Sequence, residues 1–215
     1  MSLDLSGTTG VKGVAGSVSA PSIVGDDTNT GISFPSADTI KFSTGGVERM
    51  SITNSGVSGI TAGITMADQW RVSSAFSSQN ELISFNWERN DTDFAQIGTG
   101  MSYNSGIFSF PQTGIYWINF DTSMFKDSTS VRYAGARIKT TINNSSYNTR
   151  ADGYTNIHNS GSNTYAFLRI NCIFDVTDVS THKVSFHSDA ATTISYDGSS
   201  TSNRTSATFI RLGDT

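Results

Sequence analysis

The strongest hydrophobic pattern of the chain lies in residues 108–120, with the sequence FSFPQTGIYWINF. A proline-glycine corner divides two apolar runs, and the second run carries large side chains on both alternating faces, with Tyr116 and Ile118 on one and Trp117 on the other. A strand with two apolar faces has to be covered twice. One face predicts a sandwich core, and the other predicts contact with a further subunit.

From residue 70 onward the hydrophobic period is that of β-strands, and no helical period occurs. Turn-rich segments separate the apolar runs, which is typical of a β-sandwich. The predicted strands cover residues 70–76, 83–87, 106–110, 115–125, 133–142, 165–176, 183–188 and 207–212. We therefore predict an all-β chain with a sandwich domain over residues 70–215.

The N-terminal third of the chain has a weaker pattern. Residues 1–22 are rich in Gly, Ser and Thr and predict a flexible arm. Residues 23–56 alternate short β runs with turn clusters, and these strands are too short to enclose a core. We expect this segment to attach the protein and to intertwine with identical chains, as a homotrimer. Residues 57–69 return to small residues and predict a neck linker.

One phrase within residues 25–56 consists of Thr30, Gly31, Ile32, Phe34, Pro35, Ala37, Asp38, Ile40, Phe42, Thr44, Gly45, Gly46, Glu48, Arg49 and Ile52. This phrase resembles a segment of tail-fibre and structural proteins of tailed bacteriophages. The resemblance implies an exterior virion protein, without indicating which appendage it builds.

A second motif, G-x-F-x-x-P-x-x-G-x-Y, is formed by Gly106, Phe108, Pro111, Gly114 and Tyr116. With this motif, residues 70–215 resemble the globular heads of complement-type and tumour-necrosis-factor-type proteins. The resemblance implies a ten-stranded jelly roll that forms threefold trimers. The chain lacks the second cysteine and the collagen stalk of the complement proteins, which argues against a complement function. The candidate trimer-interface residues are Ile115, Trp117, Phe209 and Leu212.

Composition and charge exclude several function classes. A net charge of −4 gives no electrostatic footprint for binding nucleic acid. Cys172 is the one cysteine, so the chain forms neither an internal disulfide nor a cysteine-based zinc site, and its alternation with apolar residues over 168–176 predicts a core position. No apolar run approaches the roughly 20 residues that span a bilayer, and the N-terminus lacks the pattern of a signal peptide.

No catalytic or metal constellation stands out. His158, His182 and His187 lack the spacing of a zinc site, although a threefold metal or anion site at His182 or His187 stays open in a trimer. The acidic groups at 26–27 and 88–93 fit turns better than a calcium loop. Paired carboxylates in an aromatic cleft are missing, as is an activated nucleophile. We predict no metal, no cofactor and no enzymatic activity.

Two polar segments, 143–163 and 196–205, are rich in Asn, Ser and Tyr. This composition suits carbohydrate, because tyrosine rings stack on sugar faces while polar groups bond the hydroxyls. The alternative is that both are solvated connectors between strands. The candidate receptor-binding residues are Tyr147, Arg150, Tyr154, Tyr196 and Arg204.

These features together predict a homotrimeric bacteriophage appendage protein, from a tail or head fibre, located on the virion. Its N-terminal segment would contact other virion proteins, and its knob would adhere to a host-surface polysaccharide or other receptor through several weak, identical sites. The alternative is a decoration or capping protein that registers a trimeric fibre without binding a receptor. A virion depolymerase is a third hypothesis.

Overall fold

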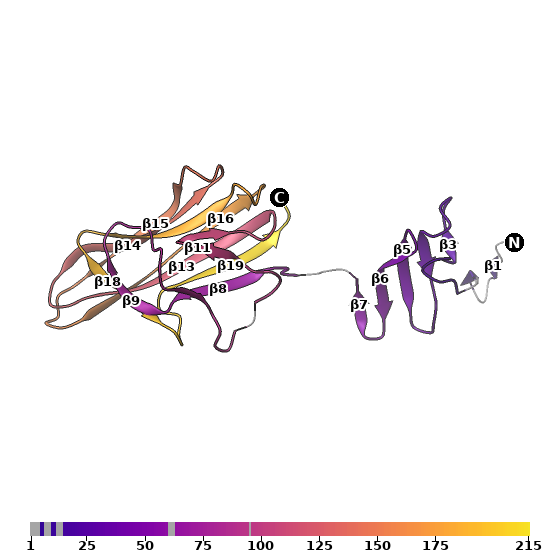
Figure 1. The fold of residues 1–215 in the computed structure, drawn as a ribbon. Helices are drawn as coiled ribbons and strands as arrows, with labels where there is room; N and C mark the ends of the chain where they lie inside the picture. The colour runs from indigo at the N-terminus through magenta and orange to yellow at the C-terminus, as the bar shows by residue number, and fades with distance from the viewer. Residues whose placement is uncertain (1–4, 7–9, 12–14, 60–62, 95) are drawn as a thin grey trace. The chain divides into compact units, whose positions relative to one another are not determined.

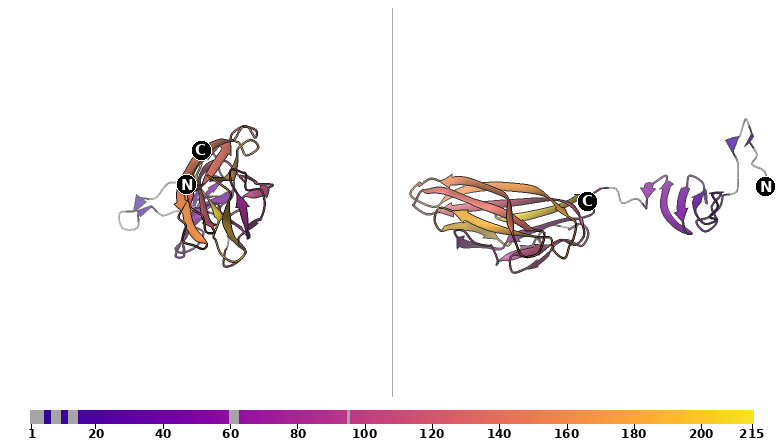
Figure 2. Two further views of the ribbon diagram at one scale, coloured as in Figure 1. Left: turned by 90° about the vertical axis from the view of Figure 1, so that its left-hand side faces the viewer. Right: turned by 90° about the horizontal axis from the view of Figure 1, so that it is seen from above.

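The computed structural model describes residues 5–6, 10–11, 15–59, 63–94 and 96–215 (Figures 1 and 2). All regular secondary structure in these residues is β-strand, which confirms the predicted fold class. Within the same ranges, no helix has the length and apolar character needed to cross a membrane. The chain divides into two compact units, Met1–Gly63 and Ile64–Thr215, called unit 1 and unit 2 below.

Unit 1 contains one five-stranded antiparallel sheet, in which β3 to β7 pair in chain order. Its strand alternation places apolar side chains on one face, with Ile40 opposite Ile52 and Ile52 opposite Val57. No hydrophobic side chain in residues 15–59 is buried, so this part of the chain has no core of its own. The strands of unit 1 are β1 (Leu5–Ser6), β2 (Gly10–Val11), β3 (Ile23–Val24), β4 (Gly31–Ser33), β5 (Ile40–Thr44), β6 (Val47–Thr53) and β7 (Gly56–Ser58).

The structure describes parts of the predicted arm and of the predicted linker. Residues 15–22 of the arm bond to β4 and the residue after it, since Ser22 N–H donates to Ile32 O and Phe34 N–H donates to Ala15 O. Residues 1–4, 7–9 and 12–14 of the arm, and 60–62 of the linker, lie outside the described residues. Strands β7 and β8 extend into the linker, because pairing with β6 and β19 overrides a composition that is weak in strand formers.

Unit 2 consists of two sheets (Figure 1). One has the order β10-β8-β19-β13-β18-β9, with β16 also paired to β13, and the other has the order β11-β12-β17-β14-β15. The strands of unit 2 are β8 (Ala67–Val72), β9 (Ser74–Ser78), β10 (Trp87–Arg89), β11 (Ser102–Asn104), β12 (Ile107–Ser109), β13 (Gly114–Lys126), β14 (Val131–Thr141), β15 (Asn148–Ile157), β16 (Thr164–Val176), β17 (Lys183–Ala190), β18 (Ile194–Ser199) and β19 (Ser206–Gly213).

Aromatic rings join the two sheets of unit 2 into one core. The Phe108 ring, from β12, lies 5.4 Å from Trp70 of β8, 5.3 Å from Phe209 of β19 and 5.5 Å from Phe186 of β17, measured between ring centroids. Tyr116, on the predicted inward face of β13, is also fully buried. Such rings bury large apolar areas and dominate the stability of a sandwich.

The proline-glycine corner of residues 108–120 has a local explanation. A Cβ atom on Gly114 would lie 2.5 Å from Gly213 O, so glycine permits β13 and β19 to approach closely where the corner ends. The Tyr116 hydroxyl donates to Gln112 O at 2.8 Å and ties the strand to the corner. The motif residues therefore serve packing and turn geometry.

Several strand predictions differ from the structure. Residues 83–86 form no strand; Ile83 is apolar because it faces the core, and its carbonyl accepts a hydrogen bond from Trp87 Nε1 at 2.9 Å. The polar segments taken as loops contain β15 and part of β18. The sheet order shows the reason for β15, since it pairs only with β14 at a sheet edge and needs no continuous apolar pattern.

Candidate functional site

The candidate site is a depression of about 440 Å³ on the outer face of the sheet that contains β14, β15 and β17. It is lined by Arg132, Tyr133, Arg137, Tyr154 and Asp189. Three strands contribute, because the register sets Tyr154 of β15 and Asp189 of β17 on either side of Gly135 of β14. Strand pairing therefore assembles groups that lie far apart in the sequence.

Gly135 leaves space for the Tyr154 ring on the outer face of β14. A Cβ atom at Gly135 would lie 2.7 Å from the Cδ1 atom of Tyr154 and 2.2 Å from Gly153 O. The Tyr154 ring can therefore lie across β14 only because residue 135 has no side chain. Tyr133 meets Tyr154 edge to face, with ring centroids 5.5 Å apart and an interplanar angle of 88°.

A buried carboxylate anchors the depression. Asp189 is only 2% exposed, forms an ion pair with Arg137, and accepts a hydrogen bond from the Tyr154 hydroxyl at 2.7 Å. That hydrogen bond is the main cause of the raised pKa of Tyr154. Burial lowers the pKa of Arg137, but the Tyr154 hydrogen bond and the Asp189 charge outweigh it, so the Arg137 pKa is raised. The Arg137 guanidinium and the Tyr154 hydroxyl are thus held in fixed positions in the wall of the depression.

Of the five predicted receptor-binding residues, only Tyr154 lines the depression. Arg204 pairs with Asp197, with 3.0 Å between Nη1 and Oδ2, and the Arg150 Nε atom donates to Thr140 Oγ1 at 2.9 Å. Tyr147 is half-buried just before β15. The predicted residues therefore do not converge on one binding site.

The prediction for Tyr196 is wrong. Its ring is fully buried and stacks on Phe76 with centroids 5.2 Å apart, and its hydroxyl donates to Gly135 O at 2.7 Å. Burial raises the pKa of Tyr196 well above its usual value. The Tyr196 side chain supports the floor of the depression from inside and is inaccessible to a receptor.

Four of the lining residues were not predicted, because they belong to strands and the predicted binding residues come from segments with a loop-like composition: Arg132, Tyr133, Arg137 and Asp189. A signal was present in the alternation of β14, where Tyr133, Arg137 and Lys139 occupy the face opposite the buried Ala134 and Ala136. Polar and aromatic residues that repeat every second position on an outer sheet face would have indicated this surface.

The outward face of the other sheet carries exposed apolar side chains. In one row across β16, β13 and β19, Ile173 lies opposite Trp117, and Trp117 opposite Ile210. Ile173 is 67% exposed. Further along the same strands, Arg169 pairs with Asp121, with 2.6 Å between Nε and Oδ1, and beyond that pair the exposed Tyr165 packs on Phe125. Apolar, ionic and aromatic rows thus share one face.

The predicted interface residues divide between this face and the core. Ile115 and Trp117 are half-buried on the outward face, and Leu212 is exposed at the irregularity where β19 pairs with the start of β13. The prediction for Phe209 is wrong, because its ring is fully buried against Phe108 in the sandwich. Alternation along β19 turns Ile210, and not Phe209, toward the outside.

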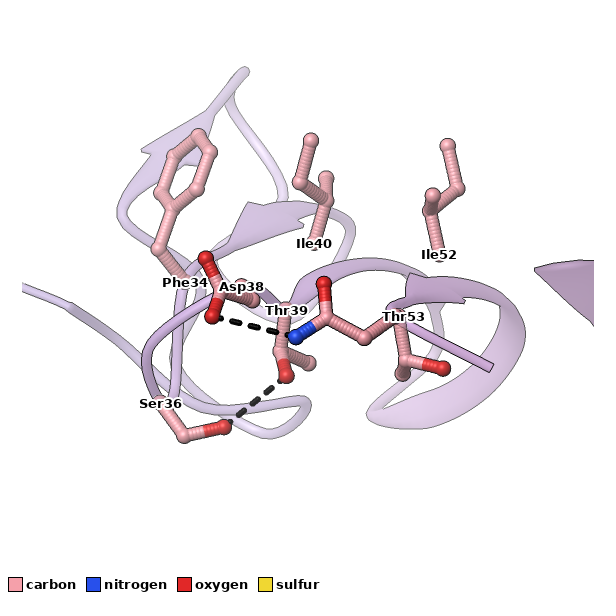
Figure 3. A pocket seen from close by; sticks show the side chains of 8 residues that line it. Phe34, Ser36, Asp38, Thr39, Ile40, Ile52 and Thr53 are labelled. Carbon is pink, nitrogen blue, oxygen red and sulfur yellow. Dashed lines mark hydrogen bonds between the residues drawn. The ribbon is translucent and has the colours of Figure 1, made fainter. Parts of the chain in front are cut away.

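A second depression, of about 400 Å³, lies in unit 1 (Figure 3). Phe34, Ile40 and Ile52 project side by side on one side of it. The polar side is held by two hydrogen bonds, from Asn54 Nδ2 to Asp38 Oδ2 at 3.2 Å and from Ser36 Oγ to Thr39 Oγ1 at 2.9 Å. The apolar residues continue the uncovered face of the unit 1 sheet.

Within the described ranges, no three His, Cys, Asp or Glu side chains gather to hold a metal ion. Burial and the charges of Lys139 and Arg137 lower the pKa of His187 to about 4, and the same positive charges disfavour a cation there. Cys172 packs against the core, and burial raises its pKa to about 11, so it carries an unreactive thiol at neutral pH.

Comparisons with known proteins show the fold alone. No protein-family model matches the chain, and no curated protein matches it. The solved structure of the Eiger TNF protein from S. frugiperda aligns with a TM-score of 0.57 at 10% identity, covering 71% of this chain and 96% of that chain. Murine APRIL aligns with a TM-score of 0.49 at 13% identity, covering 68% and 98% respectively. The alignment with the Eiger protein shows that the chain contains a tumour-necrosis-factor-like jelly-roll fold.

Proposed function

We propose that this protein is a homotrimeric adhesion protein of a bacteriophage appendage, in which unit 2 binds a glycan on the host surface. The observation that carries adhesion is the depression beside Tyr154, where two tyrosine rings and two guanidinium groups surround a carboxylate held in place. Exposed rings next to fixed hydrogen-bonding groups are what a sugar ring requires. Placement on a virion is supported by the fibre-like phrase in residues 25–56, which folds into β4, β5 and β6.

The trimer is supported by the outward face of β16, β13 and β19. Apolar side chains as exposed as Ile173 favour burial against another copy.

The uncovered face of unit 1 favours the second candidate, a capping or decoration protein. Its exposed Phe34, Val47 and Val57 require a partner whether or not unit 2 binds a glycan. Strands β3 to β7 pair with one another within one chain. We therefore expect copies of the chain to meet through the apolar face of this sheet. The two candidates share the trimer and differ only in adhesion.

Light scattering tests the trimer. Three chains of 23.0 kDa give about 69 kDa, and we expect this mass to persist on dilution. Ile173→Asp should lower the mass, because it places a charge on the proposed interface. The control is Ile142→Asp, which alters a comparably exposed isoleucine (57%) after the end of β14 and should leave the mass unchanged. A wild-type mass near 23 kDa would refute the trimer.

Binding of labelled protein to an array of bacterial surface polysaccharides and to host cells tests adhesion. Tyr154→Ala should abolish or strongly reduce binding with the trimer mass unchanged, because it removes the exposed ring. Tyr147→Ala, a tyrosine outside the depression, is the matched control and should bind normally. If the protein binds neither the cells nor the array, the capping protein is favoured. Release of reducing ends from a bound polysaccharide would indicate a depolymerase.

A further inference from the structure

The outer face around the depression is basic, although the chain as a whole is acidic. The net charge of the chain is −4. On the outer face of β14, β15 and β17, however, basic side chains outnumber acidic ones: Arg132, which lines the depression at the irregularity near the start of β14, with Arg137, Lys139 and Lys183, against Asp152 and Asp189. A local field opposite in sign to the net charge attracts an acidic ligand to this face.

The two arginines of the depression have different roles. Arg137 neutralises the buried Asp189, so that carboxylate does not repel an incoming anion. Arg132 is exposed and forms no ion pair among the residues described. Its guanidinium carbon lies 5.3 Å from the centre of the Tyr133 ring, which holds the charge at the rim by a cation–π contact.

The shape and lining of the depression suit one or two sugar rings. Its volume of about 440 Å³ falls in the usual range of small-ligand sites. The exposed Tyr154 ring offers a stacking surface, and the perpendicular Tyr133 ring closes one side. A guanidinium beside them has the planar pair of donors that matches a carboxylate.

We propose that the depression binds a carboxylate-bearing sugar, such as a uronic acid unit of a surface polysaccharide. Arg132 contacts the carboxylate, Tyr154 stacks on the sugar ring, and Arg137 and Asp189 hold Tyr154 in place. This inference rests on the proposed adhesion function and specifies its ligand class. The specificity lies in the charge of the sugar, because the ring-stacking surface alone would accept neutral sugars as well.

The test is binding of the full-length protein to polygalacturonate, alginate and hyaluronan, each paired with its carboxyl-reduced form. Reduction removes the charge and keeps the sugar ring, so we expect the reduced form to bind at least roughly 10-fold more weakly, as for the loss of one charge-assisted hydrogen bond. Arg132→Gln should reproduce that loss on the native polysaccharides. Arg132→Lys should bind with intermediate strength, because it keeps the charge without the planar fork.

Lys139→Gln is the matched control. It removes one positive charge from the same face, outside the residues that line the depression, and should weaken binding less than about 3-fold if recognition is local. Equal losses for Arg132→Gln and Lys139→Gln would overturn the proposal in favour of diffuse attraction to any polyanion. Equal binding of native and reduced polysaccharides, or no binding to any pair, would also overturn it.

Different results would refute the acidic ligand and the adhesion function. If the protein coats host cells, and Tyr154→Ala abolishes the coating while Arg132→Gln does not, the adhesion function stands and the acidic ligand is wrong. If neither the cells nor any polysaccharide on the array is bound, adhesion itself is refuted. Circular dichroism and the trimer mass of each variant establish that a loss of binding is not a loss of folding.

Discussion

Units 1 and 2 are both built from antiparallel strands with alternating apolar residues, yet among the residues that the structure describes only those of unit 2 enclose a core. In unit 1 one sheet presents its apolar face without cover, and no hydrophobic side chain of residues 15–59 is buried. In unit 2 a second sheet covers the first, and Phe108, Phe186 and Phe209 pack together. Strand alternation creates an apolar face, but stability requires a second layer.

The difference is already visible in the large residues. All Trp and Tyr residues of the chain lie in unit 2. These side chains bury the most area per residue, whereas unit 1 relies on Ile, Val and two phenylalanines, Phe34 and Phe42. Unit 1 is thus expected to depend on other copies of the chain, and unit 2 to a large extent on itself.

The largest expected effect concerns dissociation of the proposed trimer. Because the unit 1 sheet has no core, we expect the amides of β5 and β6 to lose hydrogen-exchange protection once the trimer dissociates. The amides of β13, which pair on both sides, should stay protected. Hydrogen-exchange mass spectrometry of the wild-type protein and of the Ile173→Asp variant, which we expect to dissociate, measures both sets of amides. Equal protection of β5 and β6 in the trimer and in the dissociated variant would show that unit 1 is stable alone.

The second largest effect is expected from truncating a core side chain of unit 2. Phe108→Ala removes a ring that packs against rings from both sheets, and we expect a loss of about 3–5 kcal/mol in the unfolding free energy of unit 2. Phe34→Ala is the control in unit 1, where the ring is 42% exposed; it should shift the unit 2 transition by less than about 0.5 kcal/mol. Urea unfolding followed by tryptophan fluorescence reports unit 2 specifically, because all three tryptophans lie there.

A matched pair of Asp→Asn substitutions, one in each unit, should give a smaller difference in stability. Asp68 is buried and accepts hydrogen bonds from Trp70 Nε1, Arg89 Nε and Met101 N–H at 2.9, 3.0 and 2.7 Å. Asp68→Asn places an amide against these donors and leaves Arg89 without its partner, so we expect a cost of roughly 3 kcal/mol. In unit 1, Asp38→Asn should cost little, since Asp38 is exposed and Asn tolerates its positive φ of 55°. Urea midpoints of both variants measure the difference.

The smallest expected effect is the histidine-linked pH dependence of unit 2, where all histidines lie. Burial and the charges of Lys139 and Arg137 lower the pKa of His187 to about 4 from 6.5. Between these values the unfolded chain binds more protons, so the stability of unit 2 should fall as the pH drops from 6.5 to 4. His187→Gln should remove a contribution on the order of 1 kcal/mol. The exposed His158, changed to Gln, should leave the unfolding curve at each pH unchanged.

The sequence alone determined the strand class, the two apolar faces of β13 and the lack of a core in the N-terminal segment, because side-chain alternation is a local property. It also placed Cys172 correctly against the core. Segments of similar composition were harder to separate: Tyr154 and Tyr196 both lie in polar stretches, yet one is exposed and the other buried.

Only the tertiary structure decided which residues share a site. Arg132, Tyr154 and Asp189 meet because β15 and β17 pair with opposite edges of β14, and that register depends on contacts far apart in the sequence. A shift of one residue would turn each of these side chains to the other face. Phe209 and Ile210 illustrate the same limit, since neighbouring apolar residues of β19 face the core and the outside, and only the packed sandwich tells them apart.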